Sequence, residues 1–197
     1  MTNVEPITLE GRWVRLEPLA QHHAAGLAEV ARDEEIWRYM PAKLTTIEQI
    51  KHWITETLAL QATGAVLPFA IVERAEGRAI GSTRYLNIMP RDRGLEIGWT
   101  WLGRAAWRTA VNTECKYLLL RHAFETLDCI RVQFKTDQRN ERSRRAIERI
   151  GGQFEGILRQ HMVLPDGSYR DSAFYSIIDA EWPAVKAKLA DRLYNET

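Results

Sequence analysis

Two short polar stretches follow strand-like segments of this sequence, and each has residue types that suit the binding of a phosphate group. The first, at positions 103–114, combines basic side chains, a threonine hydroxyl and two candidate helix caps: Arg104, Arg108, Thr109, Asn112 and Thr113. The second lies at positions 137–140. A helix that begins in such a stretch points free backbone N–H groups and the positive end of its dipole at an anion. An ordinary basic loop before a capped helix is the alternative for the first stretch.

Composition places the chain among globular proteins with one hydrophobic core. It has 197 residues, of which 45% are hydrophobic and 27% are charged, a balance typical of folded domains. No repeat and no Pro/Gly/Ser-rich linker divides it, so we expect a single domain over residues 1–197. The formal net charge of +1 gives no overall attraction to nucleic acid or to an anionic membrane.

Targeting signals and metal sites have little support in the sequence. The first residues lack the basic region and apolar run of a secretory signal, and no stretch approaches the roughly 20 apolar residues of a membrane span. The two cysteines, Cys115 and Cys129, form no CxxC pair, which favours a reduced, cytoplasmic setting. The five histidines show no ligand spacing, so we expect no metal and interpret His22 and His23 as a surface pair on a helix.

Hydrophobic periodicity predicts which segments position these residues. Period-two patterns and turn residues indicate strands at 12–18, 67–73, 78–88, 95–102 and 130–136, with two more on either side of a Pro-Asp-Gly turn at 165–167. Period-3.6 patterns and capping residues indicate helices at 19–31, 45–60, 113–127, 140–150 and about 179–194. Because helices form the crossovers between strands, the order predicts an α/β fold with a mixed sheet and helices on both faces.

The helix predicted at 140–150 carries the most specific motif. Asn140, Ser143 and Ile147 fall on one helix face, and a Gly-Gly-Gln-Phe run follows the helix. This segment is similar to the N-x-x-S/A segment of the GNAT N-acetyltransferases, which ends in a related glycine-phenylalanine run. In those relatives the asparagine side chain holds the pantetheine arm of coenzyme A (CoA).

The resemblance to the GNAT family covers residues 16–182 and is strongest to its RimJ/RimL-like branch. It implies a GNAT fold, with a central, mixed but mostly antiparallel seven-stranded sheet flanked by helices on both faces. It also implies an enzyme that transfers an acetyl group from acetyl-CoA to a primary amine by direct attack in a ternary complex. A homodimer is common in this branch, so a second copy of the chain is a candidate partner. A catalytically silent acyl-CoA-binding sensor or scaffold is the rival hypothesis.

In the family, a loop with the pattern R/Q-x-x-G-x-G/A binds the CoA diphosphate through backbone amides. Here Ala105 replaces Arg or Gln, Arg108 replaces the first glycine, and Ala110 keeps to the pattern. Backbone amides need no particular side chain, so the loop can still bind, provided that Arg108 does not need a positive φ. Its guanidinium could pair with a phosphate oxygen. The resemblance assigns CoA binding to Trp101, Leu102, Arg108, Thr109, Ala110, Val111, Asn112, Thr113, Asn140 and Ser143.

The resemblance also suggests the catalytic groups. Many relatives carry a tyrosine that protonates the departing thiolate where this chain has Ile147, so Ser143 is the candidate acid, with simple CoA contact as the alternative. Glu96 stands where relatives often place a carboxylate that deprotonates the amine through water, and an ion-paired structural carboxylate is the alternative. Strand alternation predicts that Glu96 and Thr100 share a face opposite Trp99. A backbone N–H near the end of this strand is expected to meet the oxyanion.

The acceptor is less defined. Trp37, Tyr39 and Trp99 are candidate acceptor contacts, with core packing as the alternative. The resemblance allows a protein N-terminal amine, a polyamine, an amino acid or an aminated antibiotic as acceptor. Glu141 and Glu148 interrupt the basic residues of the 140–150 helix, which favours a solvated face over a nucleic-acid site. One arginine of this face is a candidate contact for the CoA 3'-phosphate. We therefore expect neither nucleic acid nor membrane as a partner.

Overall fold

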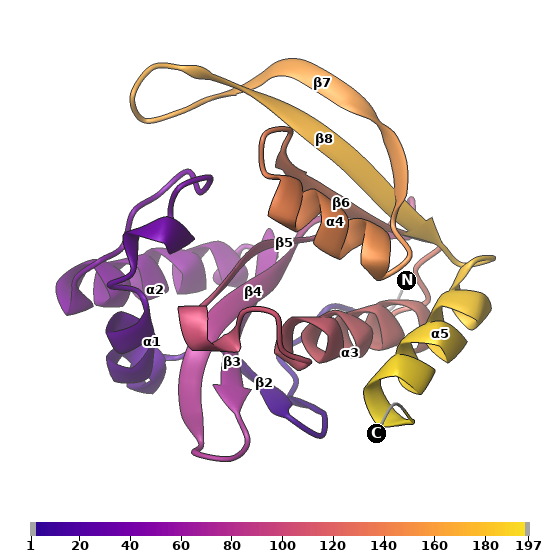
Figure 1. Ribbon diagram of the computed structural model, residues 1–197, viewed down its shortest axis with the longest axis horizontal. Coiled ribbons are helices and arrows are strands. Elements are labelled where there is room, and N and C mark those ends of the chain that lie inside the picture. The colour runs from indigo at the N-terminus through magenta and orange to yellow at the C-terminus, as the bar shows by residue number, and fades with distance from the viewer. Residues whose placement is uncertain (1–2, 196–197) are drawn as a thin grey trace.

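The computed structural model describes residues 3–195, and an eight-stranded sheet forms its centre (Figure 1). The strands are β1 (Leu9–Glu10), β2 (Val14–Pro18), β3 (Val66–Glu73), β4 (Arg78–Met89), β5 (Gly94–Leu102), β6 (Arg131–Asp137), β7 (Gln153–Val163) and β8 (Tyr169–Ile178). Their spatial order is β1-β2-β3-β4-β5-β6-β8-β7, and of the neighbouring pairs only β5 and β6 run parallel. The expected mixed, mostly antiparallel sheet is confirmed, with β1 as one strand beyond the predicted seven.

Helices cover both faces of the sheet, as predicted (Figure 1). They are α1 (Ala24–Val30), α2 (Ile47–Ala62), α3 (Val111–Glu125), α4 (Glu141–Arg149) and α5 (Trp182–Tyr194). Along β3, Phe69 and Ile71 belong to the core that also contains residues of α3, α4 and α5, while Ala70 and Val72 belong to the core with α1 and α2. The strand alternation therefore divides the apolar residues between two cores. No helix within residues 3–195 is long and apolar enough to span a membrane.

The first turn of α3 is tied to the other end of the sheet by one carboxylate. Glu114 is fully buried and accepts hydrogen bonds from the backbone N–H groups of Arg12, Trp13 and Val14 at 2.6, 2.7 and 2.9 Å. The Tyr194 hydroxyl of α5 donates to the same carboxylate at 3.0 Å. Such charge-assisted bonds are stronger than neutral ones, so Glu114 is a structural residue that fixes where α3 begins.

Strands β5 and β6 separate partway along their length. Parallel pairing joins Gly94–Glu96 of β5 only to Arg131–Gln133 of β6. Beyond Glu96, β5 continues to Leu102, and the chain returns to β6 through α3. The backbone groups of this last part of β5 that point toward β6 have no strand partner in the described structure. An extended ligand can therefore pair with them.

A β-bulge changes the side-chain directions in this part of β5. Ser82 of β4 pairs with Trp101 and Arg84 pairs with Gly98, so two residues of β5 oppose one residue of β4 between these pairs. Trp99 takes up the extra length with a φ of 50°. The bulge shifts Thr100 to the α3 face, and the prediction that it shares a face with Glu96 is wrong because strict alternation ends at the extra residue.

Candidate functional site

A cavity of about 1200 Å³ opens where β5 and β6 separate. Its walls come from the end of β5, the loop and first turn of α3, the end of β6, the start of α4 and the segment between α1 and α2. Elements from both halves of the sheet therefore contribute side chains to one space. Of the residues predicted to bind CoA, those that line the cavity are Trp101, Leu102, Arg108, Thr109, Ala110, Asn112, Thr113, Asn140 and Ser143.

The N-terminus of α3 borders this cavity and has no side-chain cap. The helix begins at Val111 after Ala110, so the prediction that Asn112 or Thr113 caps it is wrong. The Thr109 hydroxyl instead donates to the Ala106 carbonyl at 2.8 Å and accepts a hydrogen bond from the Val111 N–H at 3.3 Å. Val111 itself points into the core between α3 and the sheet. Of the first N–H groups of α3, those of Asn112 and Thr113 are thus left to a ligand or to water.

Arg108, in the loop before α3, adopts a φ of 63°. This value lies in the left-handed region, which costs a residue with a side chain roughly 1–2 kcal/mol. The condition that Arg108 does not need a positive φ is therefore not met. The glycine that the family pattern has at this position suits the same backbone, since glycine has no Cβ to clash. The loop keeps the glycine-type conformation although the glycine is absent.

Helix α4 begins differently, with Asn140 as its cap. The Asn140 side-chain oxygen accepts a hydrogen bond from the Ser143 N–H at 3.0 Å. The Ser143 hydroxyl lines the cavity and makes no hydrogen bond within the described residues. Ile147, one turn further on, also lines the cavity and packs into the core beneath α4. The predicted face of Asn140, Ser143 and Ile147 therefore does turn toward the cavity.

Most arginines of this region have partners inside the protein. Arg139 pairs with Asp137 at 2.7 Å, Arg144 donates to the Tyr175 hydroxyl at 2.9 Å, and Arg145 pairs with Glu141 at 2.9 Å. Arg142 stacks its guanidinium 3.7 Å from the ring centroid of Trp107 and lines the cavity, and burial lowers its pKa. Arg139, Arg144 and Arg145 therefore make their charged contacts within the protein, and Arg142 turns toward the cavity.

Glu96 is held by donors from both sides of the point where the strands separate. Its side chain accepts hydrogen bonds from Asn87 of β4 at 2.9 Å and from Gln133 of β6 at 3.0 Å. Lys135 of β6 lies 3.6 Å from its other oxygen. The carboxylate is nearly inaccessible to bulk solvent and still lines the cavity, so these contacts aim it at whatever enters there.

The three aromatic residues predicted to contact an acceptor lie in two environments. Tyr39 and Trp99 line the cavity. Trp37 is buried in the core under α1 and α2, where its indole N–H donates to the Ala31 carbonyl at 2.8 Å and its ring contacts Trp101. The described structure thus places Trp37 behind the cavity wall.

Sequence reasoning missed three cations that line the cavity, of which Lys116 and Arg170 are buried and Lys135 is partly buried. Lys116 of α3 donates to the Thr100 hydroxyl at 2.5 Å, and burial lowers the pKa of its ammonium group. Lys135 of β6 contacts Glu96, and Arg170 of β8 is only 6% exposed. Lys116 falls within an apolar helix stripe and Arg170 follows a turn, so neither position carries a spacing signal. Only the folded arrangement brings these charges to one cavity.

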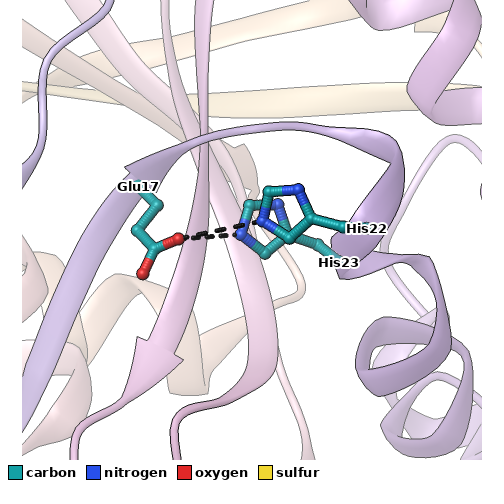
Figure 2. A group of neighbouring side chains, drawn as sticks. All are labelled: Glu17, His22 and His23. Atoms are coloured by element: carbon teal, nitrogen blue, oxygen red, sulfur yellow. Dashed lines mark hydrogen bonds and ion pairs between the residues drawn. The ribbon is translucent and has the colours of Figure 1, made fainter.

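A separate group of side chains lies at the end of β2, where both imidazoles of His22 and His23 face Glu17 (Figure 2). His23 Nε2 lies 3.1 Å and His22 Nε2 4.0 Å from the same Glu17 oxygen. The backbone N–H of Ala20 donates to His23 Nδ1 at 3.1 Å, so the neutral ring carries its proton on Nε2 and donates it to Glu17. That nitrogen offers no lone pair to a metal in this arrangement. The predicted surface pair is half wrong, because His23 is buried and only His22 is exposed.

Comparison with known proteins identifies relatives along nearly the whole chain. A family model described as an acetyltransferase (GNAT) domain matches residues 14–153. The uncharacterized N-acetyltransferase p20 from Bacillus licheniformis is 25% identical over 177 residues, which cover 89% of this chain and 98% of that protein. A GCN5-related N-acetyltransferase from Brucella melitensis is 32% identical with a TM-score of 0.91, covering 98% of this chain and 87% of that one. Mycobacterium smegmatis RimJ, solved with CoA-disulfide, shares the fold at 21% identity and a TM-score of 0.83, with 95% of each chain covered.

Proposed function

The chain belongs to the acetyltransferase (GNAT) family and is an acyltransferase, and we propose that it moves an acetyl group from acetyl-CoA to a primary amine in a ternary complex. One observation carries this proposal. A single cavity connects the uncapped N-terminus of α3, the unpaired edge of β5 and the carboxylate of Glu96. These are an anion site, a hydrogen-bonding edge for an extended arm, and a proton acceptor.

Binding of acetyl-CoA uses the first two features. We place its diphosphate at the N–H groups that open α3, where the helix dipole favours negative charge. Arg108 and Arg142 line the same space and can each add a charge-assisted hydrogen bond. The pantetheine amides would then pair with the free edge of β5 beyond Glu96, as a short parallel strand does. Nδ2 of Asn140 remains available to this arm, because only the amide oxygen is used in capping α4.

The acetyl group would then lie where the two strands separate, with the amine approaching from the face that carries Glu96. The amine must lose its proton before its lone pair can attack the thioester carbon, and Glu96 would accept that proton through a water molecule. Backbone N–H groups near the bulge at Trp99 would stabilise the oxyanion. As the C–S bond breaks, the Ser143 hydroxyl would donate a proton to the departing thiolate and take a proton back from a water molecule in the cavity.

The test is a thiol-release assay with acetyl-CoA and a panel of primary amines, compared with the rate without protein. We expect Glu96→Gln to lower kcat/KM by about 100-fold, and Ser143→Ala to lower kcat by a similar factor, as for other general acid–base groups. The Kd for acetyl-CoA should stay unchanged in Glu96→Gln, and it should change by no more than about threefold in Ser143→Ala, because a neutral hydrogen bond contributes only about 0.5 kcal/mol. The exposed turn residue Glu76 supplies the control, and Glu76→Gln should keep full activity.

Initial-rate plots at several concentrations of both substrates test the ternary complex. Intersecting lines are expected, whereas parallel lines would indicate an acetylated enzyme intermediate and contradict direct attack. Tight binding of acetyl-CoA without turnover of any amine would favour the silent sensor instead. An unchanged kcat in Ser143→Ala would remove Ser143 as the acid.

A further inference from the structure

The open face of β6 and β8 carries charged groups that the proposed reaction does not use. Val132 and Phe134 of β6 face the core under α4, so Lys135 and Asp137 project from the opposite face. Register pairs Asp137 with Ser172 of β8, which brings the start of β8 to the same place. Glu96 lies on this face as well, since Leu95 and Ile97 belong to the core on the other side. The face without α4 therefore forms the amine side of the cavity.

Arg170 is the cation on this face that has no partner. Its side chain lines the cavity, is only 6% exposed, and makes no ion pair or hydrogen bond within the described residues. Its Nε is buried without an acceptor. Burial lowers the pKa of this guanidinium, and the charges of Asp137 and Glu96 only partly oppose that effect. A buried charge without a partner is costly, so this arginine is poised to gain from an incoming anion.

The nearby carboxylates are already engaged elsewhere. Asp137 accepts three hydrogen bonds from Arg139, two from its guanidinium and one from its backbone N–H, at 2.7 to 3.0 Å. Glu96 accepts from two amides and contacts Lys135 at 3.6 Å. His161 of β7, which faces the same group, bonds to Ser172 at 3.1 Å, and burial followed by the charges of Lys135 and Arg170 lowers its pKa. The positive charge of Arg170 thus remains for a ligand.

We propose that the acceptor is an amine that carries its own carboxylate, with Arg170 binding the carboxylate while the amine lies next to Glu96. This proposal rests on the proposed acetyl transfer and narrows its acceptor class. Polycationic acceptors would meet Arg170 and Lys135 and be repelled. The carboxylate can belong to a free amino acid or to an acidic side chain next to a peptide N-terminus, and both sources present the same group to a planar guanidinium.

The test compares matched acceptors that differ only in charge. The first pair is leucine and leucinamide, and the second is two amidated tripeptides, Ala-Asp-Phe and Ala-Asn-Phe. We expect the kcat/KM of the wild-type protein to be about tenfold or more higher for the acid than for the amide in at least one pair. A tenfold ratio corresponds to the free energy of one charge-assisted hydrogen bond. The amine of leucinamide is the less basic of the first pair, so a preference for leucine opposes intrinsic reactivity.

Arg170→Gln should reduce the acid-to-amide ratio to about one, and Arg170→Lys should retain part of it, because the charge persists without the planar fork. Arg159→Gln is the matched control, since Arg159 is exposed on β7 outside the cavity, and it should keep the wild-type ratio. Equal rates for acid and amide in both pairs of the wild-type protein would overturn the proposal. So would a ratio that survives in Arg170→Gln.

Calorimetric binding of the same four acceptors to the CoA-loaded protein separates this proposal from the proposed function. If the acid binds more tightly than the amide and Arg170→Gln loses this difference, the carboxylate site is supported even where no thiol is released. In that case the proposed acetyl transfer is rejected and the proposed carboxylate site is kept. Turnover of every amine without any preference for the acid would leave acetyl transfer standing and reject the role of Arg170.

Discussion

Two helices begin at the edge of the same cavity, and their N-termini are built in opposite ways. Helix α4 is capped by Asn140, whose oxygen takes the Ser143 N–H at 3.0 Å. Helix α3 begins after Ala110 without a side-chain cap, and Arg108 in the preceding loop is held at a φ of 63°. Both ends have the same dipole. At α4 the cap takes the Ser143 N–H, whereas at α3 the N–H groups of Asn112 and Thr113 have no acceptor within the described residues and only that of Val111 is taken, by the Thr109 hydroxyl.

The comparison separates a visible motif from a binding site. The motif around α4 is easy to find because a cap needs a particular side chain, and asparagine supplies it. In the proposed function, the N-terminus of α3 binds the diphosphate through backbone N–H groups. Every residue except proline has this group, so the sequence there can differ from the family pattern without losing the donors. A poor match to the family pattern is therefore weak evidence against binding where the ligand contacts only backbone groups. A good match around α4 is in part a consequence of the cap that starts this helix.

The largest of these effects is expected from placing an anion at the N-cap position of α3, which Ala110 occupies. In Ala110→Asp, a carboxylate at the helix start competes with the diphosphate and repels it, so the Kd for acetyl-CoA should rise by about tenfold or more. The variant should be as stable as wild type or more stable by a few tenths of a kcal/mol, because the dipole favours the new charge. Calorimetric titration and urea unfolding measure the two effects. The neutral variant Ala110→Asn should bind within a few-fold of wild type, and equal affinity of the Asp variant would place the diphosphate elsewhere.

The two helix starts also show which features of the fold and of the candidate site can be predicted from the sequence. Periodicity predicted the strands and helices because burial on one face imposes a period, and the Asn140 face was found in the same way. The bulge at Trp99 and the positive φ of Arg108 could not be found, because each depends on register against a neighbouring strand or loop. The unpaired charge of Arg170 arises only when distant strands meet, so no local pattern contains it.

A smaller effect is expected from restoring the residue that the loop before α3 suits. Arg108→Gly removes the side chain that makes a φ of 63° costly, and should stabilise the protein by up to about 1 kcal/mol, reduced by the greater freedom of glycine in the unfolded chain. Arg108→Ala is the control, since it loses the guanidinium but keeps the unfavourable backbone. The midpoints of urea unfolding measure the difference. If Arg108→Gly is no more stable than Arg108→Ala, the loop relaxes to another conformation. If both variants lose the same amount of affinity for acetyl-CoA, the guanidinium of Arg108 contacts a phosphate group.

The smallest effect belongs to the start of α4 and depends on pH. Burial alone would raise the pKa of Asp137, but its hydrogen bonds from the Arg139 side chain and backbone lower it below the ordinary value. A lowered carboxyl pKa contributes stability that is present above the unfolded pKa of about 4 and is lost as the pH falls through the folded value. Asp137→Asn should therefore cost about 1 kcal/mol or less at pH 7, because Arg139 is exposed, and the difference from wild type should shrink below pH 4. Urea unfolding from pH 3 to 7 measures it, with Arg139→Gln expected to show the same pH dependence. A difference that does not change with pH would mean that Asp137 acts through its neutral hydrogen bonds, and the start of α4 would then owe nothing to charge.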